Sequence, residues 1–178
     1  MKTAFVLGIC LLAAPVSACP AGADISQPLD RIYAQMAVAP NEATSQGLAG
    51  ALWVLWLQAP DARAQDLLDR GMALRERGDY RDAEIVLTEL VTYCPDYAEG
   101  WNQRAFARYL QANFEAALPD LERTLELRPR HLGALSGKAL THVAMGQGDM
   151  AIPLIRRMVR LNPWARERDM IEDFGTEL

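Results

Sequence analysis

Residues 64–97 read AQDLLDRGMALRERGDYRDAEIVLTELVTYCPDY, and the pattern in them returns over residues 98–131 and 132–165. Three series of small residues and prolines keep an interval of 34: Gly71, Ala105 and Ala139; Ala83, Ala117 and Ala151; Pro95, Pro129 and Pro163. Two series of large residues follow the same interval: Leu67, Trp101 and Leu135; Leu87, Leu121 and Ile155. A period of this length without insertions is typical of a solenoid of stacked units.

One unit has the pattern of a helical hairpin. Two triplets in the first unit have the helical spacing i, i+4 and i+7, namely Leu67, Gly71 and Leu74, and then Ala83, Leu87 and Leu90. Each triplet therefore lines one face of a helix. Between them, Gly78 suits a helix C-terminus and Asp79 is expected to cap the next helix. Pro95 ends that second helix because proline donates no amide hydrogen bond.

These series resemble the tetratricopeptide repeat, a 34-residue helix–turn–helix with small residues at the helix contact, an aromatic residue after the turn and a closing proline. Tyr80 and Phe114 are the matching aromatic residues, whereas Gly148 stands there in the third unit. Arg108 and His142 replace the aromatic residue that is usual late in the first helix. The resemblance implies an all-α fold, a right-handed solenoid of three repeats, in which the first helices line a concave groove.

The segments on either side of the repeats are predicted to close the solenoid. Residues 19–63 hold a degenerate helical pair, Pro28–Val38 and Glu42–Gln58, with Asn41 as N-cap of the second helix. We expect this pair to cover the open N-terminal end, as a terminal repeat does. Residues 166–178 are predicted to form a charged capping helix that docks on the last repeat through three apolar side chains, Met170, Ile171 and Phe174.

Trp53 and Trp56 make the helix Glu42–Gln58 apolar over more than half its circumference. A helix of this kind is expected to be buried on two sides. The alternative is that the two tryptophans form a membrane-binding or partner-binding surface. We favour the core, because such a stripe would promote aggregation if it were exposed.

Residues 1–18 have the pattern of an export signal. Lys2 precedes an apolar run, and Val16-Ser17-Ala18 is a small-residue cleavage site, so the exported chain is expected to begin at Cys19. This predicts a periplasmic protein of a Gram-negative-type bacterium. Val16-Ser17-Ala18-Cys19 also resembles a bacterial lipobox, which implies the alternative of a membrane-anchored lipoprotein with lipid on Cys19.

The cysteines leave three alternatives open. Cys10 departs with the signal, so Cys19 and Cys94 remain, and an oxidising compartment favours a disulfide between them. If Cys19 carries lipid, Cys94 is an unpaired thiol. Two free thiols are the third alternative, and a reactive Cys94 would then suit a redox protein.

The composition argues against several functional classes. The exported chain has a net charge of −6, from 17 basic and 23 acidic residues after Lys2 is removed, and holds no basic tract, so we expect no nucleic-acid partner. His131 and His142 are eleven residues apart, which is not the spacing of a helical metal site. The chain contains no phosphate-binding loop, no nucleophile elbow and no Cys-x-x-Cys pair. We therefore expect no enzyme activity, no metal and no cofactor.

Helical angle places one set of side chains toward the concave groove: Gln65, Leu68, Met72, Glu99, Asn102, Phe106, Tyr109 and Leu140. Tyr109 could instead pack between repeats. The family's clamp for acidic C-termini is not expected, since only Asn102 has a counterpart in it. We predict a non-catalytic adaptor that binds a peptide or a partner helix in this groove. The alternative is a lipid-anchored structural component of an envelope assembly, which meets the membrane only through a lipidated Cys19.

Overall fold

The computed structural model describes residues 19–171, so the predicted signal and Phe174 lie outside the described part. Within it the chain forms helices and no strand, which confirms the all-α class. The helices are α1 (Ser26–Ala37), α2 (Glu42–Trp56), α3 (Ala62–Glu76), α4 (Tyr80–Tyr93), α5 (Ala98–Leu110), α6 (Phe114–Leu127), α7 (Leu132–Ala144) and α8 (Gly148–Leu161), followed by the 3-10 turn η1 (Arg166–Asp169).

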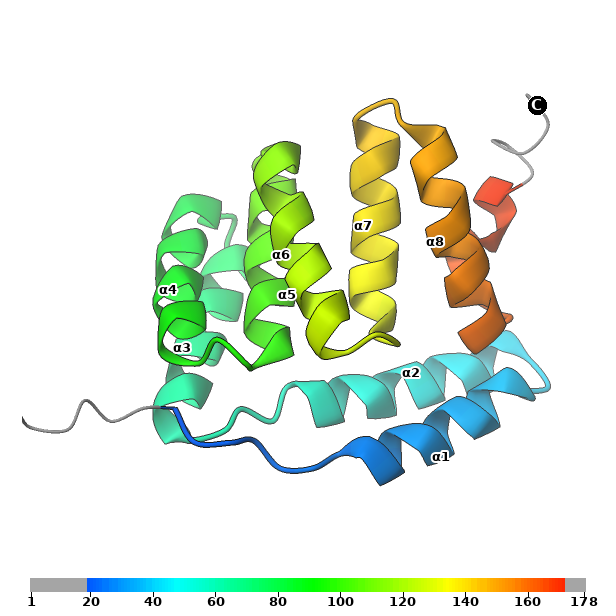
Figure 1. The fold of residues 1–178 in the computed structure, drawn as a ribbon, viewed down its shortest axis with the longest axis horizontal. Coiled ribbons are helices and arrows are strands. Elements are labelled where there is room, and N and C mark those ends of the chain that lie inside the picture. The colour runs from blue at the N-terminus through cyan, green and yellow to red at the C-terminus, as the bar shows by residue number, and fades with distance from the viewer. Residues whose placement is uncertain (1–18, 172–178) are drawn as a thin grey trace, which may run out of the picture.

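Helices α3 to α8 form three antiparallel hairpins that stand side by side (Figure 1). The small residues of the 34-residue series are all buried where the helices meet: Gly71, Ala83, Ala105, Ala117, Ala139 and Ala151. A Cβ added at Gly71 would lie 2.6 Å from atoms of Leu87, so this contact has no room for a larger residue. The predicted packing of the repeats is confirmed.

The turns within the hairpins differ from the prediction in one respect. Gly78 has a φ of +87° and Gly146 a φ of +72°, the left-handed conformation that glycine adopts at low cost. Ala112 takes the same role in the second repeat with a φ of +57°. Asp79 is the N-cap residue of α4, but its side chain accepts no hydrogen bond from the helix; its carboxylate lies 3.3 Å from the Arg77 Nε.

Arg108 and Asp120 form a buried ion network where the family has an aromatic side chain. Arg108 contacts the Asp120 carboxylate at 2.9 Å and the Glu84 carboxylate at 2.7 Å. Arg104 contacts the other oxygen of Asp120 at 2.7 Å. Two arginines thus neutralise one buried carboxylate, and the network joins α4, α5 and α6.

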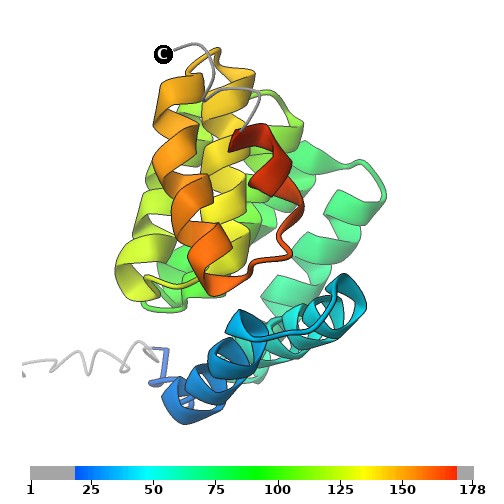
Figure 2. The same ribbon diagram turned by 90° about the vertical axis from the view of Figure 1, so that its right-hand side faces the viewer.

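The helical pair α1–α2 exists as predicted, and Asn41 caps α2 by accepting from the Thr44 N–H at 2.9 Å. The expectation that the pair covers the N-terminal end of the solenoid is wrong. The pair lies across one edge of all three hairpins, roughly perpendicular to their helices (Figures 1 and 2). The pair is called the arm below. The wide apolar surface of α2 exceeds what one helix seam can bury, so the arm packs on several repeats at once.

The arm shares one hydrophobic core with the far end of the chain. Met36, Leu52 and Trp56 pack in the same cluster as Leu135 and Met158. Polar contacts hold the arm along its length: Tyr33 Oη to Arg130 O, Ser45 Oγ to Asn162 Oδ1 at 2.7 Å, Trp164 Nε1 to Ala39 O at 2.8 Å, and Tyr97 Oη to Trp56 O at 2.9 Å. Trp56 is buried and Trp53 partly buried, so the tryptophans belong to the core.

The segment after α8 docks on the last repeat, as predicted. Met170 and Ile171 pack against the cluster of Ala139, Ala151 and Ile155. The segment begins as the 3-10 turn η1 rather than as an α-helix, and Ser136 Oγ donates to the Glu167 carboxylate.

Cys19 and Cys94 form a disulfide, with their Cα atoms 5.1 Å apart. It fastens the segment before α1 to the end of α4. Of the three thiol states open from the sequence, the structure contains this one.

Candidate functional site

The first helices of the hairpins, α3, α5 and α7, carry the residues predicted to line the concave groove. Each of these helices is about twenty ångströms long, from its residue count and the rise per residue. The end of α2 and the link to α3 cover their N-terminal halves. In the C-terminal half of α5, Phe106 is 45% exposed, so across residues 19–171 the predicted groove divides into a covered part and an open part.

In the covered part, three predicted contact residues are buried by the protein's own chain. Leu68 is 0%, Glu99 1% and Asn102 6% exposed. Leu68 packs in a cluster with the link residues Leu57 and Ala59. These residues were expected to face a ligand. In the structure Leu68 packs against the link, and Glu99 and Asn102 are bonded to each other in the interior.

Gln65 and Gly133 mark the two ends of this covered part. The Gln65 Oε1 accepts from the Ala59 N–H at 3.1 Å, which fixes the link to α3. A Cβ at Gly133 would lie 3.4 Å from the Trp53 ring, so α2 approaches α7 closely at this point. The arm therefore reaches from the first repeat to the third.

A buried polar network lies under the end of α2. Glu99 Oε2 is 2.8 Å from His131 Nε2, and Glu99 Oε1 accepts from the side-chain amides of Asn102 and Gln103. Gln103 in turn accepts from the Arg75 guanidinium. The His131 Nδ1 accepts the Ala134 N–H at 3.2 Å, so Nε2 carries the proton and donates to Glu99. The network joins α3, α5 and the start of α7.

Trp56 of α2 covers the His131 side of this network. Its ring stacks on His131 with centroids 3.9 Å apart and an interplanar angle of 22°. Tyr97 donates its hydroxyl to the Trp56 carbonyl, and burial raises the pKa of the Tyr97 phenol above its usual range. Sequence reasoning missed this cluster, because its members come from four segments with no shared motif: α2, α3, α5 and the start of α7. The one available signal was the polar Glu99 and His131 beside an unusually apolar α2.

The open part of the groove is centred on Phe106. This ring is 45% exposed, and Met72 and Leu140 beside it in the series are partly buried. The Arg75 guanidinium lies 4.7 Å from the Phe106 ring centroid, a cation–π contact. Burial lowers the pKa of Arg75, an effect that Glu76 and Glu99 oppose. The open part thus presents an aromatic ring braced by a cation.

Tyr109 packs against its own repeat. Its ring lies 5.4 Å from Phe114 across the hairpin of α5 and α6, and the residue is partly buried. Of the two alternatives for Tyr109, the structure shows packing, though within a repeat rather than between repeats.

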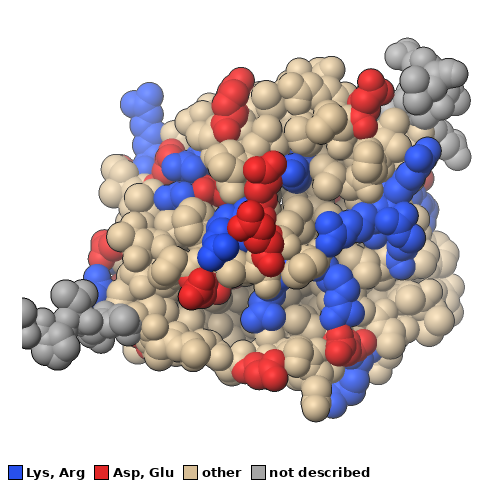
Figure 3. All heavy atoms as spheres, viewed as in Figure 1, with Lys and Arg blue, Asp and Glu red and all other residues tan. Residues whose placement is uncertain are grey.

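On the face seen in Figure 3, several basic side chains gather toward the right and several acidic ones near the centre, and uncharged surface separates most of the others. Across residues 19–171, histidine, cysteine, aspartate and glutamate side chains form no group of three that could hold a metal ion. None of the helices in that range combines the length and the apolar character that crossing a membrane requires.

The chain is similar in sequence to proteins that contain tetratricopeptide repeats, although no family model matches it. A TPR repeat-containing protein of Rhizobium etli is 27% identical over 137 residues, which are 77% of this chain and 67% of that protein. Human tetratricopeptide repeat protein 4 is 29% identical over 119 residues, 65% of this chain. The match spans only 30% of the human protein.

Solved structures share the fold. The first tetratricopeptide domain of Spaghetti (RPAP3), bound to the HSP90 peptide SRMEEVD, has a TM-score of 0.62 at 20% identity, over 65% of this chain and 92% of that chain. The TPR2B domain of yeast Sti1, in a pHsp70 complex, has a TM-score of 0.60 at 19% identity, over 66% and 100%. MamA of Desulfovibrio magneticus has a TM-score of 0.55 at 17% identity, over 88% and 92%. With the 34-residue period and its buried small-residue contacts, these likenesses identify the chain as a tetratricopeptide-repeat protein.

Proposed function

We propose that this protein is a non-catalytic interaction module that binds a peptide or a partner helix on the open part of its concave groove. The observation that carries the proposal is Phe106, a 45% exposed aromatic ring set between Met72 and Leu140. Exposed aromatic and methionine side chains in a shallow groove suit adaptable hydrophobic recognition. The Spaghetti and Sti1 domains, which share the fold, were solved in complex with chaperone peptides.

We further propose that the protein acts in the periplasm of a bacterium. The signal-like residues 1–18 support export, and the disulfide between Cys19 and Cys94 supports an oxidising compartment. A Cys19 sulfur in a disulfide cannot also carry a thioether lipid. Intact mass before and after reduction tests this, and we expect a gain of two hydrogens. An added acyl mass would favour the second candidate function, a lipid-anchored envelope component, which the lipobox-like Val16–Cys19 supports.

Peptide selection from a displayed random library, followed by calorimetry on the selected peptide, tests the groove. Phe106→Asp should weaken binding at least about tenfold, because a charge would replace the central apolar contact. Ile85→Asp is the matched control, since Ile85 is a 68% exposed apolar residue on α4, outside the groove. Circular dichroism should show equal helical content in both variants.

A crosslinking pull-down from periplasm then asks whether a natural partner uses the same surface. A discrete partner that the native chain and Ile85→Asp capture, and Phe106→Asp does not, supports the groove. Equal capture by all three proteins would contradict it and would bring the lipid-anchored component forward.

A further inference from the structure

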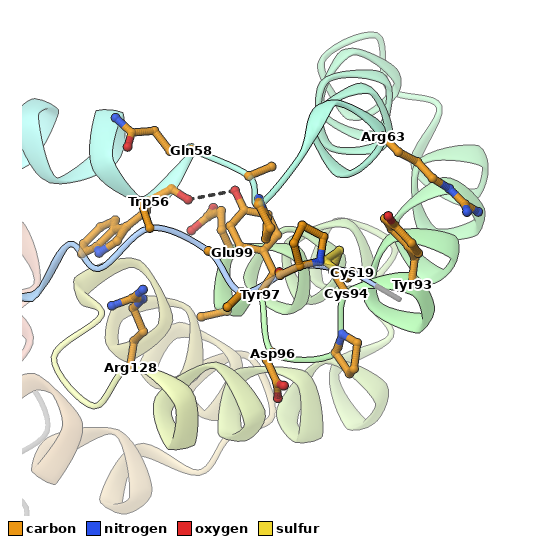
Figure 4. A pocket seen from close by; sticks show the side chains of 18 of the residues that line it. Cys19, Trp56, Gln58, Arg63, Tyr93, Cys94, Asp96, Tyr97, Glu99 and Arg128 are labelled. Atoms are coloured by element: carbon orange, nitrogen blue, oxygen red, sulfur yellow. Dashed lines mark hydrogen bonds between the residues drawn. A yellow bond between two sulfur atoms is a disulfide. The ribbon is translucent and has the colours of Figure 1, made fainter. Parts of the chain in front are cut away.

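A second site lies apart from the open part of the groove, in a cleft of about 1070 Å³ (Figure 4). Three segments form its walls: the strap Cys19–Ile25 before α1, the link after α2, and the loop between α4 and α5. The disulfide holds one end of the strap and α1 holds the other. The strap therefore spans the cleft as a tethered segment, in which Cys19 and Ile25 pack against the repeats and residues 20–24 are exposed.

The main chain of the strap has unused hydrogen-bonding groups. Within residues 19–171 the backbone N–H groups of Ala21, Gly22 and Ala23 donate to no protein atom, and their carbonyls accept from none. The three residues are exposed, so water satisfies these groups. An incoming chain can exchange that water for main-chain hydrogen bonds at little cost.

Arg128 lines the same cleft, and its side chain forms no close ion pair there. The residue is half-buried, and no hydrogen bond or ion pair connects its guanidinium to any part of the described chain. The three carboxylates on the cleft wall each have a partner: Glu89 with Arg63, Asp96 with Arg123, and Glu99 with His131. Of the two arginines that line the cleft, Arg63 is paired with Glu89, and Arg128 forms no ion pair with a described residue.

The fold explains why an arginine stands at position 128, but it provides no hydrogen-bond acceptor for the guanidinium N–H groups within the described chain. Arg128 follows the last residue of α6, where the helix dipole favours a cation. Its guanidinium offers five N–H donors in a planar fork that matches a carboxylate. Asp24 at the end of the strap forms no ion pair with it, although the Ser26 backbone N–H and, more weakly, Arg128 lower the pKa of Asp24.

We propose that this cleft binds a peptide segment that carries a carboxylate. Arg128 pairs with the carboxylate, and the strap residues Ala21 to Ala23 form main-chain hydrogen bonds with the peptide. The site is separate from the open part of the groove, so it provides a second contact for a partner or a site of its own.

Titration by NMR on the disulfide-bonded exported chain tests the proposal, with acetyl-trialanine as the probe. The amide signals of Ala21, Gly22 and Ala23 should shift and saturate. A second probe, in which the C-terminal carboxylate is replaced by an amide, should bind at least about tenfold more weakly, because it cannot form the charge-assisted hydrogen bonds. An amidated probe with an internal aspartate tells a side-chain carboxylate from a terminal one.

Arg128→Gln should weaken binding of the probe at least about tenfold, which is the effect expected when the probe loses its carboxylate. Arg156→Gln is the matched control, because Arg156 is an exposed arginine of α8 outside the cleft. Phe106→Asp should leave the titration unchanged, which separates this site from the groove. If Arg128→Gln lowers the melting temperature, Arg128→Lys takes its place, and the loss of the planar fork should still weaken binding severalfold.

The proposal is overturned if both amidated probes bind as tightly as the free acid, or if the Arg128 variants bind like Arg156→Gln. It is also overturned if acetate alone saturates the same signals at the same concentrations. That result would mark the cleft as an anion site with no peptide contact.

Discussion

The three repeats and the arm bury comparable apolar side chains but are held by contacts of different reach. In the repeats, each contact joins neighbouring helices, as where Leu87 of α4 packs over Gly71 of α3. In the arm, Tyr33 bonds Arg130 across 97 residues, and Ser45 bonds Asn162 across 117. The repeats are thus a local, periodic structure, and the arm is a single long-range brace laid over it.

This difference changes how the molecule should unfold. A plain solenoid is nearly one-dimensional, because each repeat contacts only its neighbours and can open by itself. The arm breaks this rule, since Trp56 and Leu52 share a core with Leu135 and Met158 of the third repeat. The brace should couple the ends of the solenoid and make unfolding more cooperative.

Trp56→Ala is the change expected to produce the largest difference in stability between the arm and the repeats. Trp56 is buried against His131, so its truncation should lower the free energy of unfolding by about 3–5 kcal/mol. The loss should fall unevenly: native-state hydrogen exchange should become much faster in α1 and α2, while α3 and α4 keep most of their protection.

Leu87→Ala is the matched change within the repeats. Leu87 is buried between α3 and α4, so we expect a loss of about 2–5 kcal/mol. Here exchange should accelerate first in α3 and α4. Identical exchange patterns for the two variants would show that arm and repeats form one indivisible unit.

The repeats could be predicted in detail from the sequence, and the arm only in part. Small residues recur every 34 residues from Gly71 and from Ala83, because the two helices of every hairpin pack closely at the same positions. This period can be read from the sequence. The helices of the arm were also predictable, from Asn41 and the apolar pattern of α2. The direction in which α2 packs was not, because it depends on side chains far apart in the chain, such as Trp56 and His131.

The candidate site follows the same division. Phe106 lies exposed where helical angle places it, since that angle depends only on the local helix. Glu99 and Asn102 satisfy the same angular rule, yet the arm buries them. Local geometry predicts which way a side chain points but not what another segment lays over it.

Cys19→Ser removes the covalent tie between the two regions. The disulfide closes a loop of 75 residues, so its loss should lower the free energy of unfolding by about 2–4 kcal/mol. Urea denaturation of the oxidised protein and the variant measures the difference. Dithiothreitol should lower the stability of the native protein by a similar amount and leave the variant unchanged. A variant as stable as the oxidised protein would mean that the arm's other contacts already fix the strap.

The buried phenol of Tyr33 and the partly buried phenol of Tyr97 give the interface between arm and repeats a pH dependence that the repeats' own cores should lack. Burial raises both pKa values above the usual value of about 10. Their contribution to stability is therefore complete below pH of about 10. It is lost at higher pH, because the unfolded chain ionises there while the folded chain does not.

Tyr97→Phe tests this dependence. At neutral pH it should cost about 0.5–1.5 kcal/mol, for the hydrogen bond to the Trp56 carbonyl. Above pH of about 10 it should remove up to about 1.4 kcal/mol per pH unit from the slope of the unfolding free energy. Leu87→Ala should lower stability with the slope unchanged. Urea melts from about pH 7 to about pH 11, on both sides of the ordinary phenol pKa of about 10, measure both quantities. An unaltered slope in Tyr97→Phe would mean that the arm detaches before the phenol ionises, so that the brace opens separately from the repeats it spans.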